Sequence, residues 1–262
     1  MHEQIIPINR DLIEAKSLGP KEARYLVDMF YSVQEQRKRA SNQLHSMNNQ
    51  PSAVLQWFVD QWNKLEHQLA KALDEYSDSH PVAKDAKQNV LGIGPVISAG
   101  LLAHIDVKTA KTAGSIWRFA GLDPSIEWAK GEKRPYNARL KVLCWKIGES
   151  FVRLKNRPDC FYGALLEGRW KYEKEKNESK AHAHYAQQIA KNFGKHTRAY
   201  SFYKQGLLPP AHVAARAKRW VTKLFLSHWF EKMYEYEFNK QPPRPYVFDH
   251  LEGHIHYIPP PW

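Results

Sequence analysis

The chain has 262 residues, 43% of them hydrophobic, and its 39 Lys and Arg outnumber its 27 Asp and Glu, which gives a formal net charge of +12. This composition excludes a disordered chain, because it supplies enough apolar side chains for a substantial core. The sequence shows neither a run of about 18 apolar residues nor an N-terminal signal segment, so we expect a cytoplasmic protein that does not enter a membrane. Cys144 and Cys160 are too few for a disulfide framework, and we expect both to be buried and reduced.

The positive charge is concentrated in the middle of the chain. Residues 1–80 hold 9 basic and 11 acidic residues, residues 81–240 hold 29 and 14, and residues 241–262 hold 1 and 2. We therefore expect three segments: a hairpin over 1–80, a basic helical domain over 81–240 and an extended, Pro- and His-rich tail over 241–262. A strongly basic domain is typical of proteins with an anionic partner, most often nucleic acid.

The first segment shows apolar side chains at heptad spacing in two stretches, 26–47 and 55–76, with a short polar break at 48–52. Two heptad-patterned helices of equal length joined by a short turn predict an antiparallel coiled-coil hairpin. Its expected role is spacing or homo-oligomerisation, and the alternative is that it packs on the rest of the protein. Arg37 interrupts the first apolar stripe, where we expect it either to extend to solvent or to fix the helix register.

The next stretch predicts a helix over 82–90, a turn at Gly92-Ile93-Gly94 and a second helix over 95–105 that starts with Pro95. This is the pattern of a helix-hairpin-helix element, whose glycines let the backbone approach a phosphate near the free N–H groups of the second helix. Such an element binds the nucleic-acid backbone and does not read bases. The alternative is a glycine loop between two packed helices. The residues expected to bind DNA are Gly92, Ile93, Gly94, Ser98, Lys108, Lys111, Lys130, Lys133, Arg134 and Arg139.

The remaining elements are also predicted to be helices. A short helix starts at Thr112 and ends at Gly121, a basic loop covers 130–136, and Asn137 is expected to cap a helix that runs through Leu154. Further helices are predicted at 161–176, 179–193 and 211–238. In the last of these, Arg216, Arg219 and Lys223 suit a phosphate track or, alternatively, a solvated helix face. Strand patterns are scarce, so the expected fold class is mainly α.

The segment from Leu91 to about Phe151 resembles the C-terminal domain of the insertion-sequence transposases of the "IS one-ten" class, which act by RNA-guided serine recombination. The resemblance lies in Gly92-Ile93-Gly94-Pro95, in Ala99–Ile105, in Phe119-Ala120-Gly121-Leu122-Asp123-Pro124, and in the basic loop that leads to Arg139-Leu140. It implies a DNA-binding domain of mobile-element or phage origin, with a coiled coil placed before it.

Two departures from this family bear on activity. The family carries an N-terminal ribonuclease-H-like domain with metal-binding acidic residues, and a hairpin that starts near residue 22 leaves no room for it. In the family, the nucleophilic serine comes about five residues after the proline that corresponds to Pro124. That position is Ala129 in this chain, and Ser125, the nearest hydroxyl, comes too early. We therefore expect a DNA-binding accessory or architectural protein and leave enzymatic activity open. Structured RNA is an alternative partner.

Two further readings remain as alternatives. The first is an active transposase, recombinase or nuclease that uses Ser125 or, with Mg²⁺, the acidic residues Asp106, Asp123, Glu127 and Glu132. The second is a protein–protein scaffold that works through the coiled-coil hairpin. We expect no cofactor otherwise, although His250, His254 and His256 in the tail are candidate metal ligands.

Overall fold

The computed structural model describes residues 15–47, 53–126, 128–129, 131–243 and 257–262. Within these ranges the chain is mainly helical, with ten α-helices, one short 3-10 helix and no strand, which confirms the expected fold class. No helix in these ranges is both long enough and apolar enough to cross a membrane. The helices form two compact units, described separately below: η2 and α1 to α4 belong to the first, and α5 to α10 to the second.

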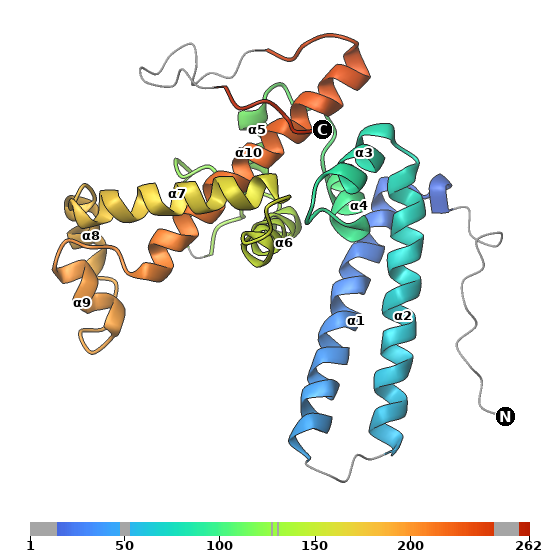
Figure 1. Cartoon of the computed structure of the whole chain (residues 1–262), viewed down its shortest axis with the longest axis horizontal. Coiled ribbons are helices and arrows are strands. Elements are labelled where there is room, and N and C mark those ends of the chain that lie inside the picture. The colour runs from blue at the N-terminus through green and yellow to red at the C-terminus, as the bar shows by residue number, and fades with distance from the viewer. Residues whose placement is uncertain (1–14, 48–52, 127, 130, 244–256) are drawn as a thin grey trace. The chain divides into compact units, whose positions relative to one another are not determined.

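The first unit is built on two long helices, α1 (Pro20–Ser46) and α2 (Ala53–Asp78), which lie side by side and run in opposite directions (Figure 1). α1 starts before the first heptad stretch and ends one residue short of it, and α2 contains the whole second stretch. At the start of α1 the Gly19 N–H donates to Glu22 Oε2 at 2.7 Å and Pro20 occupies the first helical position, so the helix begins there.

Arg37 fixes α1 against α2 through an ion pair. Its Nε lies 2.6 Å from Oε2 of Glu66 in α2, and Gln34 Nε2 donates to the other carboxylate oxygen at 2.9 Å. Burial raises the pKa of Glu66, but the hydrogen bonds from Arg37 and Gln34 outweigh it and hold this pKa below its ordinary value. Of the two roles expected for Arg37, the structure therefore agrees with the one in which it sets the helix register.

The helices α3 (Pro81–Asn89) and α4 (Pro95–His104) complete the first unit. The buried side chains of α4 join those of α1 and α2 in one apolar core: Ala23, Val27, Phe30, Leu69, Leu73, Tyr76, Val96, Ala99 and Ala103. The domain boundary expected after residue 80 therefore needs correction. Charge composition grouped these two helices with the later ones, whereas the apolar face of α4 packs on α1 and α2.

The second unit is organised around α10 (Pro210–Phe238), which contacts α5 (Ala113–Phe119), α6 (Ala138–Leu154) and α7 (Phe161–Glu178). Its core is aromatic: the Phe151 and Tyr162 rings stack with their centroids 4.8 Å apart, and Phe225 meets both rings edge-on. Asn137 caps α6 by accepting hydrogen bonds from the N–H groups of residues 139 and 140, as predicted.

Two smaller helices, α8 (Ala183–Ala190) and α9 (Arg198–Lys204), pack against each other in this unit. The helix predicted over 179–193 is shorter, and it starts later because Lys180 adopts a left-handed backbone with φ 57°, which cannot continue a helix. The prediction missed α9 altogether.

Candidate nucleic-acid interface

The start of α4 is open. Gly94 precedes the helix with an extended backbone (φ −96°, ψ −177°), no side chain caps α4, and a Cβ added at Gly94 would meet no atom within 4 Å. The first N–H groups of any helix lack partners inside the helix, and the helix dipole places positive charge there. The space beside Gly94 at this end of α4 is therefore open.

Gly92 packs closely against α6. Its φ of +101° lies in the region that favours glycine, and a Cβ there would come within 3.0 Å of Ser150 Oγ and 3.1 Å of Leu154 Cδ1 in α6. Its carbonyl oxygen also accepts a hydrogen bond from Ser150 Oγ at 2.8 Å. Gly92 is therefore needed for packing on α6, and the expectation that its backbone approaches a phosphate stays a prediction.

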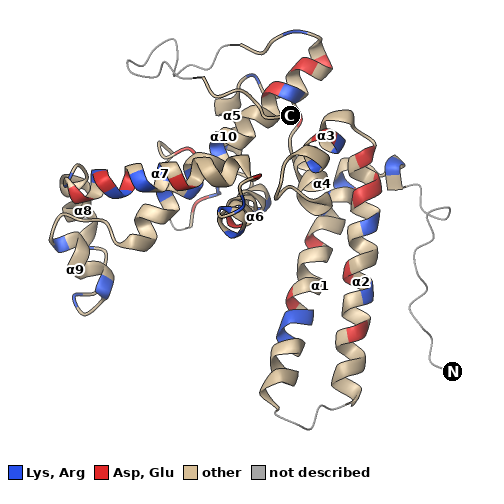
Figure 2. Ribbon diagram, viewed as in Figure 1, with Lys and Arg blue, Asp and Glu red and all other residues tan. Residues whose placement is uncertain are grey.

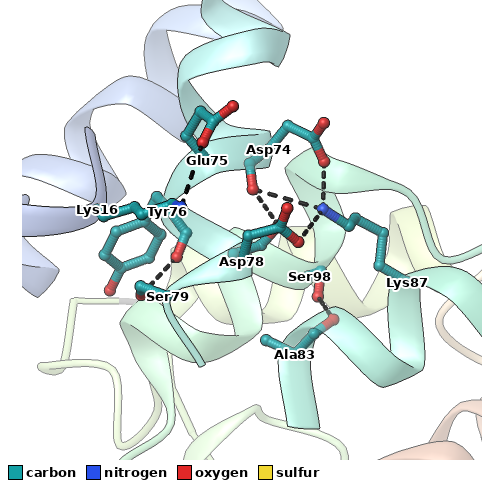
Figure 3. Close-up of polar contacts among 10 residues, drawn as sticks. Lys16, Asp74, Glu75, Tyr76, Asp78, Ser79, Ala83, Lys87 and Ser98 are labelled. Atoms are coloured by element: carbon teal, nitrogen blue, oxygen red, sulfur yellow. Dashed lines mark hydrogen bonds and ion pairs between the residues drawn. The ribbon is translucent and has the colours of Figure 1, made fainter. Parts of the chain in front are cut away.

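Two other residues expected at the interface are buried. Ile93 is 2% exposed, and Ser98 is fully buried, where its hydroxyl donates to the carbonyl oxygen of Ala83 in α3 at 2.7 Å (Figure 3). A small residue at position 98 lets α3 and α4 approach closely. Neither side chain lies on the surface, and the Ser98 hydroxyl holds the two helices together; that these residues contact DNA stays a prediction.

Lys87 in α3 is also committed to the fold. Its Nζ makes ion pairs with Asp74 and Asp78 of α2, the second at 2.7 Å (Figure 3). Burial lowers the pKa of Lys87, but these hydrogen-bonded carboxylates raise it above its ordinary value. The charge of Lys87 is thus already balanced within the first unit.

The basic residues expected to extend the interface are exposed wherever the structure describes them. Lys108 belongs to the first unit, and Lys111, Lys133, Arg134 and Arg139 to the second. The guanidinium of Arg134 lies 5.6 Å from the centroid of the exposed Trp128 ring. Lys130 lies outside the described residues.

Ser125 forms a local turn. Its hydroxyl donates to Asp123 Oδ1 at 2.7 Å and its N–H donates to the same oxygen at 2.9 Å. These hydrogen bonds lower the pKa of Asp123, so this carboxylate is a weaker base than an ordinary one. The arrangement explains the turn and does not activate Ser125 as a nucleophile.

The acidic residues considered for a metal site accept separate local hydrogen bonds. Asp106 accepts from the Lys108 N–H, Asp123 from Ser125, and Glu132 from the Ala129 N–H. No group of three metal-ligating side chains occurs in the part of the chain that the structure describes. Glu127 and the candidate ligands His250, His254 and His256 lie outside that part.

The cysteines are buried and unpaired, as predicted. Burial raises the pKa of Cys144 to about 12 and raises that of Cys160 as well. Because the thiolate is the reactive form, neither residue is suited to nucleophilic catalysis.

One feature of α6 was missed from the sequence. Trp145 is 53% exposed, and the ammonium groups of Lys146 and Lys218 lie 5.6 and 5.4 Å from its ring centroid. Val142, one turn earlier, is also exposed. An exposed aromatic ring between cations is a surface on which a nucleic-acid base can stack. The sequence pattern that could have revealed this surface is an apolar stripe, with Val142 and Trp145, on the face of α6 opposite its buried face.

Comparison of the chain with protein-family models, with curated proteins and with solved structures finds no match in any of the three.

Proposed function

We propose that this protein binds DNA by holding its phosphate backbone, largely without sequence preference, as an accessory or architectural factor of a mobile element or phage. The observation that carries the proposal is the uncapped start of α4 at Gly94, where a Cβ would meet no atom within 4 Å. The mobile-element origin rests on the sequence resemblance over residues 91–151.

The packing of α3 on α4 supports a helix-hairpin-helix element over 82–105. The hydrogen bond from Ser98 to Ala83 and the packing of Ile93 hold the two helices so that Gly94 stands at the end of the pair. In this proposal the N–H groups at the start of α4 donate to one phosphate. Lys108 in the first unit and Lys111, Lys130, Lys133, Arg134 and Arg139 supply further phosphate contacts.

Substitutions at Gly94 test the proposal, because its backbone suits any residue. Asp is a good helix cap, so Gly94→Asp should keep or raise the melting temperature, yet its carboxylate would stand where the phosphate binds. We expect this variant to bind a 20-base-pair duplex at least about tenfold more weakly, and Gly94→Ser to bind within about twofold of the wild type.

Gly168→Asp is the matched control. This exposed glycine of α7 also has no atom within 4 Å of its Cβ position, and its replacement changes the net charge equally. It should leave duplex binding within about twofold of the wild type. Wild-type affinity in the folded Gly94→Asp variant, or equal losses in both Asp variants, would contradict the proposed site.

A second candidate function is self-association through the end of the proposed coiled-coil hairpin. Met47, Val54, Trp57 and Phe58 are each more than 40% exposed there. Residues 40–59 contain no Lys, Arg, Asp or Glu, and Figure 2 shows no charged residue on the described ribbon at this end. A neutral apolar surface meets no charge repulsion from a second copy of itself.

Light scattering after size exclusion tests this candidate. We expect the wild type to be an oligomer and the double variant Trp57→Ser, Phe58→Ser to be a folded monomer. A monomeric wild type at micromolar concentration would contradict self-association, and it would leave the DNA-binding proposal to the Gly94 experiment.

A further inference from the structure

A buried carboxylate lies at the centre of a cationic group in the second unit. Glu173 in α7 is 2% exposed and accepts hydrogen bonds from Arg169 Nη2 at 2.6 Å and from Arg216 Nε in α10 at 2.7 Å. The Arg169 guanidinium also lies over the rings of Tyr172 and Trp220, 4.7 and 5.3 Å from their centroids. Both arginines are therefore held in fixed orientations, each with N–H groups beyond those that Glu173 uses.

Three more basic side chains, those of His182, His212 and Arg219, lie next to Glu173 and its two arginines. His182, just before α8, places its buried Nε2 3.7 Å from Glu173 Oε2, too far for a hydrogen bond. His212, Arg216 and Arg219 follow one another at helical spacing along one face of α10. We call Arg169, Glu173, His182, His212, Arg216 and Arg219 the Glu173 cluster.

The sequence that follows α7 adds basic residues to the Glu173 cluster and no carboxylate. Residues 179–230 contain nine Lys and Arg and no Asp or Glu. Glu173 is thus the one carboxylate in the cluster for three arginines. Burial and the positive charge of Arg219 and Arg216 lower the pKa of His212, and burial and Arg216 lower that of Arg219. Partly buried cations that repel one another are stabilised when an anion binds between them.

Arg219 is the side chain best placed to meet such an anion. It makes no hydrogen bond or ion pair with any residue that the structure describes, and it is exposed. The Tyr203 hydroxyl contacts Nδ1 of His212 at 3.1 Å, and this contact does not use Nε2, the other ring nitrogen. Tyr185, 45% exposed, has its ring 6.0 Å from that of His212.

We propose that the Glu173 cluster is a second binding site, in which Arg216, Arg219 and His212 hold a phosphate group of a nucleic-acid strand. Guanidinium groups form paired hydrogen bonds with tetrahedral oxyanions, and a buried carboxylate keeps Arg169 and Arg216 oriented for this task. This inference rests on the proposed function only in assigning the phosphate to a nucleic-acid strand. The binding site itself is independent of Gly94.

Histidine NMR with inorganic phosphate tests the site directly in the full chain. Bound phosphate favours the charged imidazolium, so adding it should raise the pKa of His212. The Arg219→Gln variant should lose most of this effect and bind phosphate about tenfold more weakly at an unchanged melting temperature. Lys195→Gln, which removes one exposed charge outside the cluster, should behave like the wild type.

Single-stranded oligonucleotides with and without a 5′-phosphate identify the source. If only the 5′-phosphorylated strand binds in an Arg219-dependent way, the site takes a terminal phosphate, and if both strands do, it takes a backbone phosphodiester. Equal losses in Arg219→Gln and Lys195→Gln would overturn the site in favour of general charge attraction. Binding of inorganic phosphate without either strand would overturn the nucleic-acid assignment. The Gly94→Asp variant should keep its phosphate response, which separates this test from that of the proposed function.

Discussion

The Ser98 hydroxyl in α4 donates a hydrogen bond of 2.7 Å to the carbonyl oxygen of Ala83 in α3, and both residues are fully buried. This contact joins the two helices that flank the glycine turn. It gives the Ser98 side chain a role in the fold, whereas the Cβ position of Gly94 faces open space.

Replacement of Ser98 by Val should destabilise the protein and leave DNA binding unchanged. The substitution removes the buried hydrogen bond and adds a methyl group to a filled position, so we expect a loss of about 1–3 kcal/mol in the free energy of unfolding. Urea denaturation measures this loss, and binding is measured at a temperature where the variant is folded. Normal stability combined with weak DNA binding would return Ser98 to the interface.

Replacement of Gly92 by Ala should also act on stability. The residue has φ +101°, and the new Cβ would crowd Ser150 and Leu154 in α6. Gly131→Ala is the control, because Gly131 has φ +100° with no atom near its Cβ position. Both variants incur backbone strain of about 1–3 kcal/mol, and Gly92→Ala should lose more by the cost of crowding. Equal losses in urea denaturation would show that Gly92 is not packed against α6.

The sequence predicted helices well where their apolar periodicity spans several turns, as in α1, α2, α6 and α10. The sequence did not predict the roles of residues whose contacts depend on tertiary packing. Gly92 and Ser98 carry the same sequence pattern whether they meet a phosphate or another helix, and only the positions of Ser150 and Ala83 distinguish the two cases. The Glu173 cluster was out of reach because Glu173, His182 and Arg216 come from three helical segments with no fixed sequence spacing.

The stability of the second unit should fall as the solution is acidified, because of His228. This residue is buried, its Nδ1 lies 2.7 Å from the Tyr162 hydroxyl, and its Nε2 donates to the Ile258 carbonyl at 2.7 Å. Burial lowers its pKa to about 4. The unfolded chain, with a histidine pKa of about 6.5, therefore binds more protons than the folded chain between these two values.

The contribution of His228 is complete above about pH 6.5 and is lost progressively as the pH falls toward about 4, by at most about 3 kcal/mol. Urea denaturation of the wild type and of His228→Gln at pH 7.5, 5.5 and 4 measures it. The variant should lose less stability over this interval than the wild type. Identical pH dependence of the two proteins would show that His228 is not the titrating group.

Ser125→Ala should leave DNA binding intact and remove no activity. The Ser125 hydroxyl donates to Asp123, whose pKa this hydrogen bond lowers, so no strong base faces it. Incubation of the protein with supercoiled DNA and Mg²⁺, followed by denaturing electrophoresis, checks this point. A covalent protein–DNA adduct that forms in the wild type and disappears in Ser125→Ala would support the recombinase alternative.

The salt dependence of duplex DNA binding tests the central claim most directly. Each phosphate that the protein neutralises releases counterions, so log K should fall linearly with log salt concentration by about 0.9 per contact. For a footprint of about six phosphates the slope should lie near −5. Wild-type protein titrated onto a fluorescent duplex between 50 and 300 mM NaCl gives this slope. A steep negative slope is the result that the phosphate-binding account predicts, and a flat response, or no binding at 50 mM NaCl, would contradict it.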